Sequence, residues 1–111
     1  MVSASVRKLG CFAFCQCKLL RKVVFEPGSR LEFIRRSCFA ESGLRKVIIP
    51  ASVRVIDSFA FYSCQELSAL SFEEGSRLSK VDFQAFHGTR LRPENVHYPD
   101  TLKPEEHWHE W

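Results

Sequence analysis

The fold is decided by the stretch Ile49-Pro50-Ala51-Ser52-Val53-Arg54-Val55-Ile56, which is followed after three residues by Ala60-Phe61-Tyr62-Ser63-Cys64. Much of the chain matches itself when it is shifted by 47 residues. Ser5-Val6-Arg7 returns as Ser52-Val53-Arg54, Phe12-Ala13-Phe14 as Phe59-Ala60-Phe61, and Gly28-Ser29-Arg30-Leu31 as Gly75-Ser76-Arg77-Leu78. Self-similarity at a fixed period indicates a repeat architecture.

Each block of 47 residues holds two shorter units, which gives about four units of about 23 residues, near 5–28, 29–51, 52–75 and 76–100. A unit of this size cannot bury its own apolar residues, so its neighbours have to stack on it. We therefore expect one solenoid domain over residues 1–100. Residues 101–111 are expected to form a polar C-terminal tail, because Pro104 and two Glu residues stand where aliphatic residues would be needed.

The first three units each contain a segment with the period of a strand. Residues 20–25, 44–49 and 67–72 begin with Leu, carry Val or Leu three residues later, and end on Phe or Ile. Apolar residues two apart point to the same side of an extended chain. The Pro and Gly residues that follow predict turns. Small residues beside a Phe, as in Ala60-Phe61, predict short helical or 3₁₀ turns on the opposite face.

This combination of residues resembles the BspA-like leucine-rich repeat family over about residues 5–91. The resemblance implies an α/β solenoid, a leucine-rich-repeat-like right-handed coil with a short parallel sheet on its concave face. It also implies a surface antigen or adhesin-like protein, since that family serves attachment and protein binding on the surfaces of host-associated bacteria and of protists. The chain departs from the pattern after Leu91, where Arg92-Pro93-Glu94-Asn95 delays the next apolar pair until Val96 and Tyr98-Pro99.

Positive charge gathers in the first half of the chain. The formal net charge is +3, but residues 1–56 hold eleven Lys or Arg and three acids, whereas residues 57–111 hold five and ten. An asymmetry of this kind bears on partners and on self-association rather than on the fold.

The strand positions that alternate with the buried ones form the candidate partner-binding site. In the first two strands they are Arg21, Lys22, Val24, Arg45, Lys46 and Ile48. Parallel strands lie about 4.8 Å apart, so four cations are expected to cluster beside two exposed aliphatic side chains. Such a surface suits a protein partner with an acidic segment. The alternative is that these cations are merely solvated and discourage edge pairing of the sheet.

Nucleic acid is a second partner to consider, because Arg35, Arg36 and Arg54 add positive charge to the same half. The chain has no helix-turn-helix, zinc-finger or aromatic RNA-binding motif, and its aromatic residues fall at core positions. We therefore do not expect it to bind nucleic acid.

The cysteines do not have the spacing of a metal site. The pattern Cys11-x3-Cys15-x-Cys17 differs from the C-x2-C of common zinc sites. Cys17 and Cys64 hold equivalent repeat positions, and Cys38 stands where other units have Ala, so these thiols are interpreted as small core residues. If the protein is exported, a disulfide between one of Cys11, Cys15 and Cys17 and a distant cysteine is the alternative.

No catalytic centre or cofactor is expected either. The repeat brings no nucleophile beside a base, and neither of the phosphate-binding glycine motifs is present. His107-x-His109 in the tail lacks a third metal ligand. We therefore expect a non-enzymatic protein.

The compartment is left open by the sequence. The longest apolar run, Cys11–Cys15, is shorter than the roughly 18 residues that cross a bilayer. Arg7-Lys8 before an apolar segment resembles a secretory signal, but the segment recurs near residue 56 and is better explained by the repeat. Without a leader and with an odd number of cysteines the default is cytoplasmic, whereas the family resemblance implies the cell surface.

An alternative function is a fragment or building block of a larger repeat array that self-assembles end to end. The first unit begins almost at Met1 without a capping element, and solenoid ends normally need one. The oppositely charged halves could also pair between chains.

Overall fold

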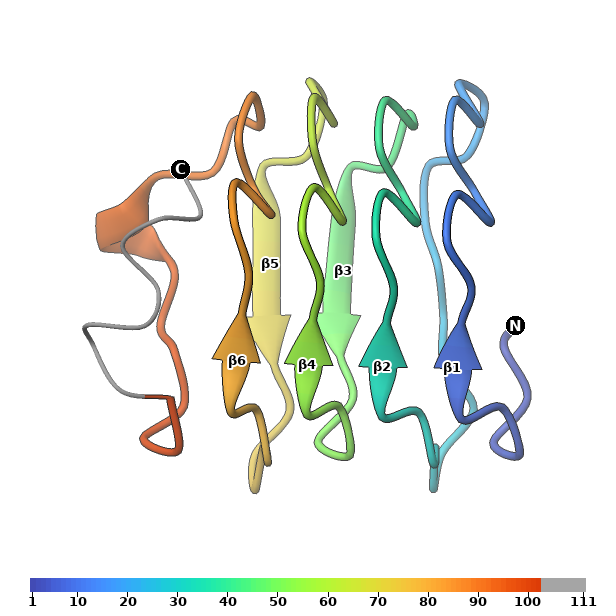
Figure 1. The fold of residues 1–111 in the computed structure, drawn as a ribbon, viewed down its shortest axis with the longest axis vertical. Helices are drawn as coiled ribbons and strands as arrows, with labels where there is room; N and C mark the ends of the chain where they lie inside the picture. Colours follow the sequence, from blue (N-terminus) through green and yellow to red (C-terminus); the bar gives the residue numbers. More distant parts are fainter. Residues whose placement is uncertain (103–111) are drawn as a thin grey trace.

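The structure, a computed structural model that describes residues 1–102, is a coil whose successive turns lie side by side (Figure 1). The larger of its two parallel sheets joins β1 (Lys8–Leu9), β2 (Phe33–Ile34), β4 (Val55–Ile56) and β6 (Lys80–Val81) in that order. The smaller sheet pairs β3 (Lys46–Ile49) with β5 (Ala69–Phe72). In Figure 1 the chain climbs through the larger sheet, returns behind it through the smaller one, and advances toward the C-terminal end, which makes the coil right-handed.

The recurring Phe residues form one continuous column in the core. The rings of Phe14, Phe39, Phe61 and Phe86 stack with their centroids 5.2, 5.2 and 5.6 Å apart. Their spacing in the sequence is 25, 22 and 25 residues, so long and short coils alternate. Fully buried aliphatic residues form parallel columns, one of which contains Leu31, Val53 and Leu78. These columns are the repeat solenoid that the 47-residue period predicts.

The sequence predicts one strand in each unit, whereas the structure also contains the four-stranded sheet. Each of its strands has only two residues, the second of which is buried. A strand this short does not show the alternation that identifies strands in a sequence. It is defined by its pairing with neighbouring coils, as in Leu9 opposite Ile34 and Ile34 opposite Ile56.

The predicted strands of the second and third units correspond to β3 and β5. In β3 exposed and buried residues alternate, as the period predicts. The predicted strand over residues 20–25 is only partly formed, since this segment makes two isolated parallel bridges, Val2 with Phe25 and Lys22 with Lys46.

The predicted helical or 3₁₀ turns are runs of reverse turns in the structure. Phe12 and Gln16 have φ values of 60° and 61°, and a left-handed residue interrupts a right-handed helix. Alternate N–H groups donate to the neighbouring coil instead, as the N–H of Phe14 does to the carbonyl of Cys38 at 2.7 Å. Within residues 1–102 the one helix is the 3₁₀ segment η1 (Pro93–Asn95), which lies after these turns.

The repeat resumes after η1, which accommodates the insertion that follows Leu91. The ring of Tyr98 lies 5.7 Å from that of Phe72, which confirms that the register returns at Tyr98-Pro99. Leu102 is also buried in the core. Residues 103–111 of the predicted tail, including its His pair, lie outside the described residues.

Candidate functional site

Four of the six predicted site residues share the outer surface of the smaller sheet. In β3, Lys46 and Ile48 point outward, and the residues that follow them enter the core. Lys22 lies beside Lys46 as its partner in a parallel bridge. Val24 and Ile48 are 42% and 61% exposed. We call Lys22, Val24, Lys46 and Ile48 the β3 surface.

The guanidinium of Arg21 folds back onto its own chain. It donates to the main-chain carbonyls of Lys18, Leu20 and Gly43. Gly43 leaves room for it, because a Cβ there would collide with the guanidinium and with the Lys18 carbonyl. Arg45 is exposed, and its N–H donates to the carbonyl of Arg21 at 2.9 Å. The structure thus differs from the predicted four-cation cluster, because Arg21 braces the first two coils and the cations of the β3 surface are Lys22 and Lys46.

The smaller sheet opens between the first coil and β3. The described residues of these two segments share one bridge, between Lys22 and Lys46, and a groove of about 280 Å³ lies beyond it. Along the strand direction the groove is lined by the two Lys residues, then by Val24 and Ile48, and finally by Glu26 and Glu73. The two carboxylates accept the main-chain N–H groups of Ala4 and Ala51, each 22 residues earlier in the chain, at 2.8 Å, and these bonds hold them in place.

A second groove, of about 390 Å³, lies on the other side of β3. Ser68 and Ser71 of the third coil line its floor, and Arg90, Arg92 and Asn95 line its far side. Ile48 lines both grooves, so this exposed aliphatic side chain stands between them.

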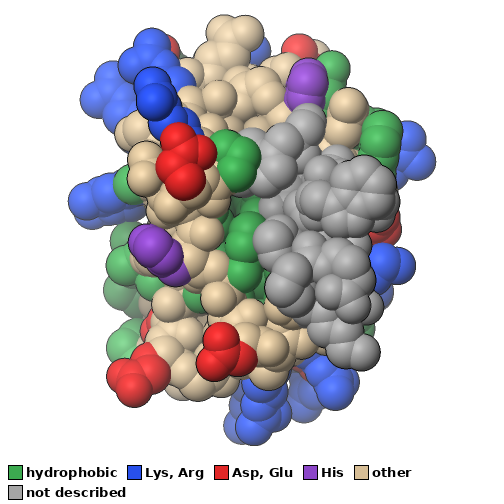
Figure 2. Space-filling model, turned by 90° about the vertical axis from the view of Figure 1, so that its left-hand side faces the viewer, with side chains coloured by type: hydrophobic (Ala, Val, Ile, Leu, Met, Phe, Trp, Pro, Cys, Tyr) green, Lys and Arg blue, Asp and Glu red, His purple; other side chains and the backbone are tan. Residues whose placement is uncertain are grey.

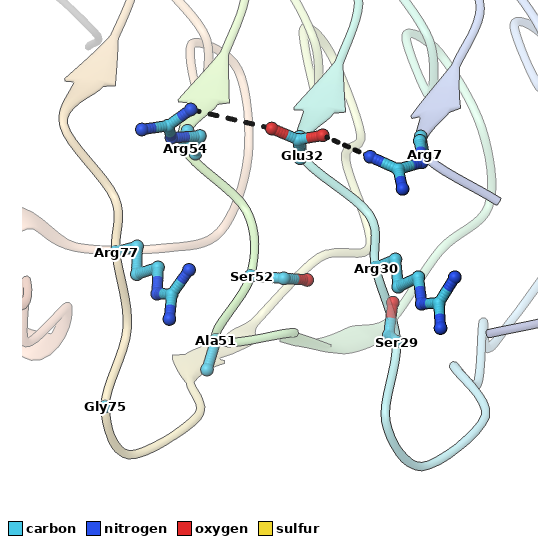
Figure 3. A pocket seen from close by; sticks show the side chains of 9 residues that line it. All are labelled: Arg7, Ser29, Arg30, Glu32, Ala51, Ser52, Arg54, Gly75 and Arg77. Carbon is cyan, nitrogen blue, oxygen red and sulfur yellow. Dashed lines mark hydrogen bonds and ion pairs between the residues drawn. The ribbon is translucent and has the colours of Figure 1, made fainter. Parts of the chain in front are cut away.

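A third groove, of about 580 Å³, lies where the chain passes from the smaller sheet to the larger one (Figure 3). Its charged residues are Arg7, Arg30, Arg54, Arg77 and Glu32, and we call it the arginine groove. One oxygen of the Glu32 carboxylate lies 3.5 Å from the Arg7 guanidinium, and the other lies 3.6 Å from that of Arg54. The groove therefore holds four guanidinium groups and one carboxylate, which pairs with two of them.

These arginines are not among the predicted site residues, although the sequence contains a signal for them. Arg7 and Arg54 are equivalent in the 47-residue repeat, and so are Arg30 and Arg77. The two pairs stand in different units but only two positions apart in the repeat, so the stacking of the coils brings them to one edge.

The two buried thiols are structural. Burial raises the pKa of the Cys38 thiol to about 12 and also raises the pKa of Cys64. The Cys64 Sγ donates to the carbonyl of Phe39 at 2.9 Å. All five cysteines are free, and residues 1–102 contain no group of three side chains suited to hold a metal ion. In the same part of the chain, no helix has the length and apolar character needed to cross a membrane.

Stacked coils with a Phe column and parallel sheets define the class of the protein, a leucine-rich-repeat solenoid. A family model described as "BspA type Leucine rich repeat region (6 copies)" matches residues 1–105, and the chain belongs to this family. Comparison with curated proteins gave no match.

A solved structure shows the same fold. The chain is similar to the crystal structure of the pneumococcal vaccine antigen PcpA, with a TM-score of 0.74 and 23% sequence identity. The similarity covers 89% of this chain and 30% of that one, so the chain spans less than a third of the length of PcpA.

Proposed function

We propose that the chain is a non-enzymatic protein-binding module that recognises an acidic segment of a partner protein on the β3 surface. The observation that carries this proposal is the pair of exposed aliphatic side chains, Val24 and Ile48, beside Lys22 and Lys46 at the edge of a groove. Exposed apolar strips bordered by charge are typical of protein interaction sites.

The β3 surface offers two kinds of attraction to such a partner. Covering the aliphatic side chains removes apolar area from water, which favours a complex. The Lys residues attract acidic side chains and accelerate association. Since all these groups are exposed, we expect binding to weaken as salt rises.

We propose further that the module is displayed at a cell surface as an antigen or adhesin-like protein. Two findings support this: the family to which the chain belongs, and the similarity to PcpA, which is a vaccine antigen. Antibodies against the chain, applied to intact and to permeabilised cells of the source organism, test the location. Labelling of permeabilised cells alone would contradict display at the surface.

A photo-crosslinking side chain placed at Ile48 tests the binding site. We expect it to capture a partner that the same group at Leu19, which is exposed outside the β3 surface, does not capture. The charge-reversed variant Lys22→Glu/Lys46→Glu should lose this product. The matched control is Lys8→Glu/Lys80→Glu, which makes the same change of net charge on the larger sheet. If the first variant keeps its circular dichroism spectrum and still captures the partner, the assignment to the β3 surface is wrong.

Stacking into a larger array is a second candidate function, and the apolar side chains at the two ends of the described coil favour it. In the first coil Val6 and Phe14 are only half-buried, whereas Leu31 and Phe39, their equivalents in the second coil, are fully buried. Hydrophobic side chains are also visible on the C-terminal end of the described coil (Figure 2). Light scattering at low and high salt tests the idea, and a monomer at both would remove it.

A further inference from the structure

The arginine groove contains two adjacent rows of polar residues that run across the coils. One row holds Arg7, Glu32 and Arg54, the residues that precede β1, β2 and β4. The other row lies two residues earlier in each coil and holds Arg30, Ser52 and Arg77. Since neighbouring parallel strands are about 4.8 Å apart, arginines of one row are about 10 Å apart.

Main-chain hydrogen bonds between coils hold both rows in place. The N–H of Glu32 donates to the carbonyl of Arg7, and the N–H of Arg54 donates to the carbonyl of Glu32, both at 2.8 Å. The N–H of Arg77 is tied to the carbonyl of Ala51 at 2.8 Å. The spacing of the guanidinium groups is therefore set by the solenoid rather than by flexible loops.

Charge in the groove is poorly balanced. Glu32 is shared by Arg7 and Arg54, whose side chains are 66% and 60% exposed, so these ion pairs are weak. Among residues 1–102 no acid lies within ion-pair distance of Arg30 or Arg77. Figure 3 shows the Arg30 side chain on one side of Ser52 and the Arg77 side chain on the other.

The groove also offers hydroxyl groups and small side chains. The Ser52 Oγ is buried, and no described residue forms a hydrogen bond with it. Ser29, Ala51 and Gly75 complete the lining, which leaves the main chain open to close approach. Among residues 1–102 no aromatic side chain lines the groove, although stacking on aromatic rings is what binds single-stranded nucleic acid.

We propose that the arginine groove binds sulfate groups of a sulfated polysaccharide. A guanidinium donates two parallel hydrogen bonds to an oxyanion, and four of them in two rows can engage sulfates on successive sugars. The Glu32 carboxylate and the serine hydroxyls suit the sugar hydroxyls that lie between the sulfates. This site is separate from the β3 surface and does not depend on the function proposed for it.

Isothermal titration calorimetry with the full chain and a heparin-derived hexasaccharide tests the proposal. The variant Arg30→Gln/Arg77→Gln should bind at least about tenfold more weakly, because two charge-assisted contacts are lost. Lys22→Gln/Lys46→Gln removes the same charge from the β3 surface and should weaken binding less than about threefold. Glu32→Gln should tighten binding, since it removes a like charge from the groove.

Three results would overturn the proposal. Equal weakening in the two double variants would mean that net charge alone attracts the ligand. Equal affinity for the chemically desulfated hexasaccharide would remove the role of sulfate. Tighter binding of a single-stranded oligothymidylate of matched charge, lost in Arg30→Gln/Arg77→Gln, would assign the groove to nucleic acid. Circular dichroism of each variant verifies that the exposed substitutions leave the fold intact.

Discussion

Phe61 lies in the middle of the Phe column and is enclosed on both faces by aromatic rings. It is fully buried, with Phe39 at 5.2 Å and Phe86 at 5.6 Å between centroids. Phe61→Ala should lower the free energy of unfolding by about 3–5 kcal/mol, because it removes a buried ring and leaves a cavity. Urea denaturation followed by circular dichroism measures the loss.

Phe14→Ala is the matched control for that substitution. Among the described rings Phe14 stacks on Phe39 alone, and it is half-buried, so its removal should cost clearly less than that of Phe61. The repeat pattern by itself predicts equal costs for the two residues. Equal measured losses would therefore contradict the end position that the structure gives to Phe14.

Cys38 makes stability depend on pH in the alkaline range. Burial raises the pKa of its thiol from the ordinary value of 9.0 to about 12. The unfolded chain loses this proton first, so the thiol's contribution to stability is complete below about pH 9 and declines as pH rises toward 12.

Measured from pH 8 upward, the free energy of unfolding should fall less steeply in Cys38→Ala than in the unchanged chain. Alanine is the residue at the equivalent position of the other three units. If Cys38→Ala and the unchanged chain lose stability with the same slope, the thiol of Cys38 is not shielded from water as the structure shows.

At the scale of elements, the reverse turns that lead from the larger sheet to the smaller one depend on residues in the left-handed region. Ser63 has a φ of 55° and Gly88, its equivalent in the next coil, a φ of 81°. A Cβ at Gly88 would also lie 3.1 Å from the Cα of Ser63. Gly88→Ala should destabilise the protein by about 1–2 kcal/mol, since a side chain in this conformation is strained. Thermal unfolding measures the change.

Ser63→Gly is the complementary change at the same turn position. A glycine adopts positive φ without strain, so this variant should keep or raise the melting temperature despite the greater freedom of its unfolded chain. A fall as large as that of Gly88→Ala would show that Ser63 contributes more than its backbone conformation.

At the scale of the whole molecule, the opening between the first coil and β3 predicts uneven stability. Solenoid coils contact only their neighbours, so a weak interface lets one coil open separately. In hydrogen exchange, the amide of Phe14, bonded to Cys38, should exchange faster than that of Phe61, bonded to Ala85. Mass spectrometry of proteolytic fragments measures both. If both amides exchange at the rate of global unfolding, the first coil does not unfold separately and the prediction is wrong.

Much of the fold could be predicted because burial follows the repeat. The period of 47 residues places Phe14 and Phe61 in one column, and the alternation in residues 44–49 points Lys46 and Ile48 outward. The turns escaped prediction because Phe12 and Gln16 are not residues that usually signal positive φ. Of the candidate site, the sequence indicated the β3 surface but not the position of the Arg21 side chain, which depends on Gly43 in the next coil.

The sequence by itself determined which side chains enter the core, because periodic apolar residues are buried wherever the coils stack. The tertiary structure alone decided which polar groups meet across coils, since this depends on the stacking of long and short units. It produced the second sheet, turned Arg21 onto the main chain, and gathered Arg7, Arg30, Arg54 and Arg77 in one groove. Residues of different coils are far apart in the chain, and only coil-to-coil hydrogen bonding fixes their distances.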